Sequence, residues 1–186
     1  MTTDVDAKAL VWRLGARVPG HDYRIFTTAF VDGQHPRTGA TKRFSLIDSV
    51  DWVNMIALTT DERVVLIRQY RVGAGEVCLE IPGGMVDAGE TPAEAAAREL
   101  IEETGYTSAR WAQIGRVSPN PAIQTNHLYT FLALDAVQTS APRPEGSEVI
   151  EVSTATLAEC HAAIRDGRVD HALVIAAFAH LAFRDP

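Results

Sequence analysis

Apolar and polar residues alternate with a period close to two in the first half of the chain, in short runs separated by turn-forming residues. Runs of this kind, rich in β-branched and aromatic residues and bounded by Gly, Pro and Asp, predict β-strands. We expect the first three to form an antiparallel meander, and the sixth to end at the break Pro82-Gly83-Gly84. The six predicted strands are Leu10–Val18, Tyr23–Val31, Lys42–Ser49, Trp52–Leu58, Val64–Tyr70 and Val77–Ile81.

A helical period follows this break. Thr91-Pro92-Ala93-Glu94 has the form of a capping box with proline at the first helical position, and Gly105 is a typical terminating residue. One helix is therefore predicted over Pro92–Thr104. The remaining predicted elements are strands at Trp111–Val117, His127–Leu134 and Val149–Val152, and helices at Thr156–Asp166 and His171–Phe183.

The order of these elements predicts an α/β (α+β) fold in which a mixed β-sheet lies between helices, an α/β/α arrangement. Order alone does not fix the topology of that sheet. The 186 residues, 46% of them apolar, suffice for one full core but not for two. We therefore expect residues 51–186 to form the main domain, and residues 1–50 to form an N-terminal β extension that belongs to the same unit.

Charge and cysteine content narrow the class of protein. A formal net charge of -7 disfavours binding to long nucleic acids or membrane surfaces, although a metal ion and local arginines can still attract a small anion. Cys78 and Cys160 lack metal-site spacing and are interpreted as buried, reduced thiols. The polar, acidic N-terminus does not resemble a signal peptide, and no apolar run is long enough to span a membrane. We expect a soluble cytoplasmic protein.

Carboxylates gather on one face of the predicted central helix. At 100° per residue, Glu99, Glu102 and Glu103 fall within one arc of roughly 100°. Like charges at these spacings destabilise a helix by a few tenths of a kcal/mol per pair unless a cation lies among them. Oxygen ligands without His or Cys favour Mg²⁺ or Mn²⁺ over zinc or copper. The opposite face, expected to pack on the core, carries Ala93, Ala97, Leu100 and Ile101.

The residues around these carboxylates resemble the Nudix box, and the chain is identified as a member of the Nudix hydrolase family on that basis. So many constraints would coincide by chance in a chain of this size with a probability of about one in ten million. One departure is the aromatic Tyr106 at a position that is more often aliphatic. The matching positions are Gly84, Glu90, Arg98-Glu99-Leu100, Ile101, Glu102-Glu103, Thr104, Gly105 and Tyr106.

This resemblance implies metal-dependent hydrolysis of a pyrophosphate bond, with Mg²⁺, or alternatively Mn²⁺, as the cofactor. It implies that Glu99 and Glu103 are the principal metal ligands. Glu102 is implied to be a further ligand or a base-like partner, and the Gly83 carbonyl is implied to be a backbone ligand. Arg98 is expected to orient the carboxylates, because it lies one turn from Glu102 and one turn from Glu94 on the same helix.

The loop before the helix is expected to bend tightly over the metal. Gly84 and Gly89 would permit this bend, and Glu90 would tie the loop to the helix.

Motifs outside the box resemble the branch of the family that contains ADP-ribose pyrophosphatases and nucleoside diphosphate sugar hydrolases. They are Arg68-Gln69-Tyr70-Arg71, Leu79-Glu80-Ile81-Pro82-Gly83-Gly84, and Pro121, 16 residues after Gly105. Ala122 and Asn126 stand where many ADP-ribose hydrolases have glycine and glutamate, which also opens substrates such as GDP-mannose. The substrate-binding residues predicted from this resemblance are Arg68, Arg71, Glu80, Met85, Pro121 and Asn126.

The resemblance also suggests where the catalytic base and the partner subunit lie. In this branch a glutamate on a late loop can act as the base, and Glu148, followed by Glu145, occupies the corresponding region. N-terminal strands in the branch pair across a two-fold axis, so a homodimer is predicted.

Two other functions stay open: a nucleotide-sugar sensor without catalysis, and a hydrolase of nucleoside triphosphates or dinucleoside polyphosphates. The intact carboxylates disfavour the sensor, and the long N-terminal region disfavours triphosphates as substrates.

Overall fold

The computed structural model describes residues 7–146 and 148–184. Contacts group these residues into two compact units. The smaller unit contains the described residues up to Ser49 together with Ser118–Asn126, and the larger contains Val50–Val117 and the described residues from His127 onward.

In the described part of the smaller unit, three strands form an antiparallel sheet in the order β1-β2-β3, which confirms the predicted meander. Residues 118–126 join this sheet, because Ile47 donates its N–H to the Ile123 carbonyl at 2.8 Å and accepts the N–H of Thr125 at 3.1 Å. The strands begin a few residues away from the predicted bounds, and Leu10 lies in a short 3-10 helix instead. The elements are η1 (Ala7–Leu10), β1 (Arg13–Asp22), β2 (Thr27–Gln34) and β3 (Thr41–Asp48).

The described residues of the larger unit contain an eight-stranded mixed sheet whose central path runs β11-β5-β4-β10-β8. Strands β4 and β10 are parallel, and the other pairs are antiparallel. Strand β6 pairs with β5, β7 with β4, and β9 with β10. The strands are β4 (Trp52–Thr59), β5 (Arg63–Arg71), β6 (Glu76–Glu80), β7 (Gly83–Met85), β8 (Tyr106–Thr107), β9 (Arg110–Val117), β10 (Leu128–Gln138) and β11 (Ile150–Thr156).

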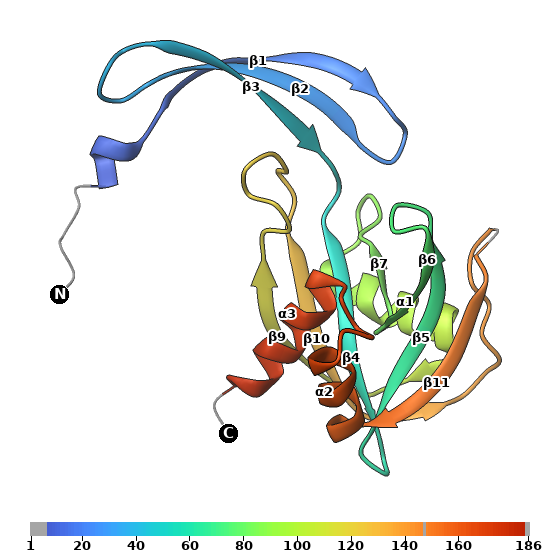
Figure 1. Cartoon of the computed structure of the whole chain (residues 1–186). Coiled ribbons are helices and arrows are strands. Elements are labelled where there is room, and N and C mark those ends of the chain that lie inside the picture. Colours follow the sequence, from blue (N-terminus) through green and yellow to red (C-terminus); the bar gives the residue numbers. More distant parts are fainter. Residues whose placement is uncertain (1–6, 147, 185–186) are drawn as a thin grey trace, which may run out of the picture. The chain divides into compact units, whose positions relative to one another are not determined.

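Helices cover both faces of this sheet, which confirms the α/β/α arrangement (Figure 1). Successive residues of a strand point to opposite faces, so Met55 of β4 packs in the core on the α1 side and Ile56 packs in the core on the α2 and α3 side. No helix in residues 7–146 and 148–184 is long and apolar enough to cross a membrane. The α-helices of this unit are α1 (Pro92–Thr104), α2 (Leu157–Arg165) and α3 (Ala172–Ala182).

The predicted end of the sixth strand is confirmed, because β6 stops at Glu80, just before Pro82-Gly83-Gly84, but the two glycines belong to a further strand that was not predicted. Gly83 begins strand β7, which pairs with β4 so that Gly83 lies opposite Asn54. The pairing is close: a Cβ atom at Gly83 would lie 2.5 Å from the Val53 carbonyl oxygen. Glycine therefore permits this approach of two backbones and does not end the sheet.

Helix α1 has the predicted bounds, and Leu100 is buried as predicted, but the rest of the buried face lies nearer to the carboxylates than expected. The Thr91–Glu94 capping box is complete, and Gly105 ends the helix with a left-handed φ of 74°. Ala93 and Ala97 are exposed, and Ile101 is 36% exposed. The side that carries Glu103 faces the sheet instead, because the small Ala95 and Ala96 beside it let the helix approach closely. The buried residues are Ala95, Ala96, Leu100, Glu103 and Thr104.

Candidate active site

The carboxylates of α1 lie against the backbone of β7. Glu103 is only 3% exposed, and its Oε2 accepts the N–H of Gly83 at 2.9 Å. Burial raises the pKa of Glu103 to about 8, and burial also raises the pKa of Glu99, against the opposing effect of Arg98. These carboxyl groups are thus held where a negative charge is costly, and a bound cation would remove that cost.

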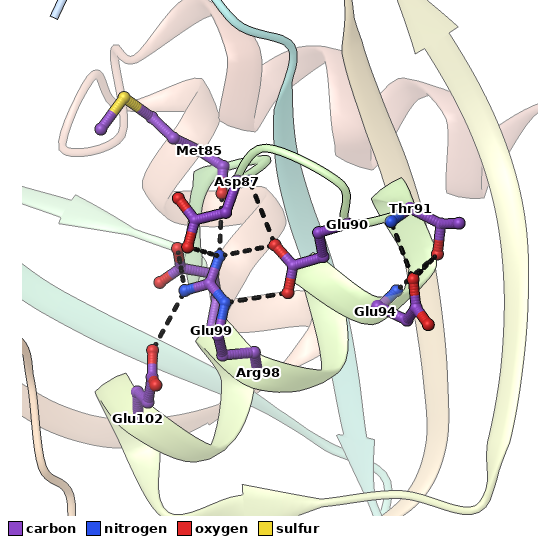
Figure 2. Close-up of polar contacts among 8 residues, drawn as sticks. All are labelled: Met85, Asp87, Glu90, Thr91, Glu94, Arg98, Glu99 and Glu102. Atoms are coloured by element: carbon purple, nitrogen blue, oxygen red, sulfur yellow. Dashed lines mark hydrogen bonds and ion pairs between the residues drawn. The ribbon is translucent and has the colours of Figure 1, made fainter.

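Arg98 lies at the centre of the cluster (Figure 2). Its guanidinium group donates to both carboxylate oxygens of Glu90 at 3.0 Å, to Glu99 at 2.9 Å and to Glu102 at 3.1 Å. It also donates to the Met85 carbonyl at 3.0 Å, which links α1 to β7. The geometry agrees with the predicted orienting role of Arg98. Glu94 does not take part, because its carboxylate bonds to Thr91 in the capping box.

The loop between β7 and α1 is held as predicted by Glu90, which also accepts the Asp87 N–H at 3.2 Å. Gly89 has a left-handed φ of 87°, consistent with a tight bend. Gly84 has another role: a Cβ atom there would lie 2.1 Å from Oε1 of Glu99. Glycine at this position makes room for a carboxylate.

The donor set fits a hard divalent cation, because Glu99, Glu102 and Glu103 offer only oxygen atoms and two of them have raised pKa values. Among residues 7–146 and 148–184, however, no group of three or more His, Cys, Asp or Glu side chains is arranged to hold a metal ion. Arg98 engages Glu99 and Glu102, while Glu103 is bonded to Gly83. These carboxylates would have to turn from their present partners to share one ion.

A cavity of about 300 Å³ adjoins the Gly83-Gly84 backbone. Arg71 and Glu80 line it and form a two-pronged ion pair, with distances of 2.8 and 2.9 Å between guanidinium nitrogens and carboxylate oxygens. Met85 lines the same cavity. The structure therefore brings together three of the predicted substrate-binding residues.

Arg68 lies elsewhere. It is three residues from Arg71 on strand β5, and an odd separation places two side chains on opposite faces of a strand. Arg68 is half-exposed, pairs with Glu151 at 3.4 Å, and lines a second cavity beside α2. The structure does not bring it to the carboxylate cluster.

The two late glutamates also differ in position. Glu148 accepts a hydrogen bond from Nε2 of Gln69 at 3.4 Å, and its negative charge contributes to the raised pKa of both Glu99 and Glu103. Glu148 therefore lies close to the α1 carboxylates. Both glutamates are exposed, and Glu145 contacts Glu148 through its backbone carbonyl, which accepts the Glu148 N–H at 3.1 Å.

Pro121 and Asn126 belong to the smaller unit, where Pro121 is exposed and Asn126 is 3% exposed. They stay predictions. Cys78 and Cys160 are both free and buried, as predicted.

Asn54 and His171 line the cavity without having been predicted. The signal for Asn54 was available: it is the lone polar residue among the apolar residues Val53, Met55, Ile56 and Ala57. His171 had no comparable signal, because it is far from β4 in the sequence and reaches the cavity only through the folding of the chain.

Comparisons with known proteins agree with this geometry. A family model described as "NUDIX domain" matches residues 50–178. The methanol dehydrogenase activator of Bacillus methanolicus is 29% identical over 157 residues, 83% of this chain and 84% of that protein. The ADP-ribose pyrophosphatase of Bacillus subtilis is 27% identical over 155 residues, 83% of each chain. These matches extend over most of both proteins.

A nudix hydrolase of Caenorhabditis elegans is 49% identical over 65 residues, 33% of this chain, so this chain spans 29% of that relative's length. A solved structure described as "Crystal structure of ADP compounds hydrolase" aligns with a TM-score of 0.80, 22% identity and 92% coverage of each chain, which supports the fold. Divalent metal ions are the general cofactors of Nudix hydrolases. Because the family model spans most of the chain and its carboxylate helix is intact, this protein belongs to the Nudix family and is a Nudix pyrophosphohydrolase.

Proposed function

We propose that this protein hydrolyses the pyrophosphate bond of ADP-ribose, or of a related nucleoside diphosphate sugar such as GDP-mannose, to a nucleoside monophosphate and a sugar phosphate. The observation that carries the proposal is the pair of carboxylates on the Gly83-Gly84 backbone: Glu103 is buried and accepts the Gly83 N–H, while the partly buried Glu99 lies against Gly84 and is held by Arg98. Similarity to an ADP-ribose pyrophosphatase over 83% of the chain supports the substrate class.

Mg²⁺ is the proposed cofactor, with Mn²⁺ as a substitute. Glu99, Glu102, Glu103 and the Gly83 carbonyl would hold it. When bound, such an ion neutralises phosphate oxygens and makes a coordinated water more acidic.

The protein's own side chains have distinct proposed roles. Arg98 positions Glu99 and Glu102 through its guanidinium fork, which presents N–H groups in a fixed plane. Glu148 accepts the proton of the attacking water, because it is the late glutamate that lies near the α1 carboxylates. Glu145 is the second choice for this role.

Substrate contacts are proposed for Arg71, Glu80 and Met85, which share the cavity beside β7. The charge of Arg71 is already matched by Glu80, so its contribution is to place hydrogen-bond donors and not to supply a free positive charge. Pro121 and Asn126 remain proposed substrate contacts on the family resemblance alone. Arg68 is the weakest of the predicted contacts, because it lies on the other face of β5.

A homodimer located in the cytoplasm is also proposed. The exposed apolar side chains of β1 support self-association: Leu14 is 62% exposed and Val18 is 51% exposed. Light scattering at assay concentration should give twice the monomer mass. A uniform monomer would contradict the proposed dimer.

The test of the reaction is a screen of ADP-ribose, GDP-mannose, UDP-glucose, diadenosine polyphosphates and nucleoside triphosphates, with and without Mg²⁺, with products identified. The substitutions Glu99→Gln and Glu103→Gln should each lower turnover by orders of magnitude. Glu94→Gln, on the same helix, is the matched control, because glutamine also completes a capping box. Hydrolysis of triphosphates alone, or wild-type turnover in Glu99→Gln, would overturn the proposal.

A further inference from the structure

The cavity beside β7 contains buried polar groups that the reaction described above does not use. Asn54 of β4 is 5% exposed and lines the cavity. Its Nδ2 donates to the Leu173 carbonyl at 3.0 Å, which fixes the orientation of the amide. Its Oδ1 is buried and has no hydrogen-bond partner among the described residues. One half of the amide is therefore satisfied by the fold and the other half is not.

His171, which lines the same cavity, carries a second unmatched polar atom. It stands at the start of helix α3, but its side chain makes no capping hydrogen bond. Its Nδ1 is buried and also lacks a partner in the part of the chain that the structure describes. Nearly all buried polar atoms of proteins are hydrogen-bonded, so two exceptions in one cavity call for an explanation.

The composition of the cavity indicates what enters it. Apolar side chains form much of the wall, among them Trp52, Leu128 and Leu173. The lining charges are those of Arg71 and Glu80, which neutralise each other. A neutral ring suits these surroundings better than a phosphate. A volume of about 300 Å³ lies at the lower end for ligand pockets, which suits one end of a nucleotide sugar.

The cavity shares the Gly83-Gly84 segment with the carboxylate cluster. Glu103 bonds to the Gly83 N–H, and Glu99 lies against Gly84, while both glycines also line the cavity. A diphosphate beside the carboxylates would thus have one of its end groups next to the cavity.

We propose that this cavity binds one neutral end group of the substrate, and that Asn54 and His171 are its specificity-determining residues. Oδ1 of Asn54 accepts a hydrogen bond from an N–H or O–H of that group, and Nδ1 of His171 makes the second polar contact. This proposal deepens the proposed function and rests on it for the diphosphate part of the ligand. Either a nucleobase or a sugar ring has the required donors.

The experiment compares wild type with Asn54→Leu, which keeps a similar volume and removes the acceptor. Dissociation constants are measured by calorimetry in EDTA, so that binding is followed without turnover. One ligand series varies the base at constant sugar: ADP-, GDP- and UDP-glucose. The other varies the sugar at constant base: ADP-ribose, ADP-glucose and ADP-mannose. Values of kcat and KM with Mg²⁺ complete the comparison.

The matched control is Thr130→Val. Thr130 lies beside Asn54 on the neighbouring strand β10, is fully buried, and has an Oγ1 without a partner among the described residues, but it does not line the cavity. His171→Phe serves as a second variant if Asn54→Leu does not fold.

We expect Asn54→Leu and His171→Phe to weaken binding by about tenfold to a hundredfold for the preferred ligands, and to change the ratios within one series. A changed base series assigns the cavity to the nucleobase, and a changed sugar series assigns it to the sugar. The Thr130→Val ratios should match wild type. Equal weakening of all ligands, unchanged ratios, or a wild type that binds none of them would overturn the inference. A wild type that binds these ligands and hydrolyses none refutes the proposed function alone.

Discussion

Gly84→Ala is the substitution for which the structure gives the clearest expected effect. A Cβ atom at this position would lie 2.1 Å from Oε1 and 2.3 Å from Cδ of Glu99. Ordinary van der Waals contact begins at 3.4 Å, so the Glu99 carboxylate must move by more than 1 Å. A displacement of about 1 Å at a reacting centre costs on the order of 10²-fold in rate, or about 2.7 kcal/mol of transition-state stabilisation.

The assay is steady-state hydrolysis of the best substrate, together with urea unfolding of the same preparations. We expect kcat/KM of Gly84→Ala to fall about a hundredfold while the free energy of unfolding changes little, because the side chain of Glu99 can move without a shift of the backbone. Gly73→Ala is the matched control, since a Cβ atom there meets nothing within 4 Å. Equal activity of the two variants would refute the idea that Gly84 exists to admit Glu99.

Three further predictions concern other parts of the larger unit. Arg98→Lys should lower the free energy of unfolding by roughly 2–3 kcal/mol in urea titrations. The reason is that an ammonium group cannot replace the planar guanidinium group that joins Glu90 to Glu99 and Glu102. Unchanged stability would contradict this prediction. Glu148→Gln should lower kcat by roughly 10²–10⁴-fold, as loss of a general base does, whereas Glu145→Gln should stay close to wild type; the reverse order would exchange their roles. Cys78 and Cys160 should react slowly with a thiol reagent at pH 8 and rapidly in guanidinium, because burial raises the pKa of both thiols, to about 11 for Cys160. Rapid labelling of the native protein would show that they are accessible.

Local sequence rules predicted the two ends of α1 accurately, but they did not predict which of its faces is buried. The capping box and Gly105 set the ends of the helix through contacts within a few residues, which a sequence displays directly. The buried face depends on what lies opposite, and hydrophobicity misled the prediction because this helix buries Glu103 and exposes Ile101. The hydrophobic pattern is expected to mispredict burial at a functional site, where a carboxylate is buried although burial disfavours its charged form.

The site residues also divide into those whose place follows from local sequence and those whose place depends on distant parts of the chain. The alternation of side chains along a strand places Arg68 and Arg71 on opposite faces of β5. The prediction treated both as substrate contacts because they belong to one family motif, Arg68-Gln69-Tyr70-Arg71. The proximity of Glu148 to α1 arises from the path of a long loop, and the place of His171 in the cavity arises from the docking of α3. Neither follows from spacing along the chain, whereas the polar Asn54 within an apolar strand was a usable sign.

The hydrogen bonds between residues 118–126 and β3 limit where the protein can be truncated or its units exchanged. The region matched by the family model, residues 50–178, includes this segment, yet its hydrogen bonds are made to Ile47 and Asp48. A fragment starting at Val50 would keep the segment and lose those partners. The chain therefore crosses the boundary between the two units three times, after Ser49, Val117 and Asn126. An exchange of units with a relative must replace the N-terminal strands and the β9–β10 connection together.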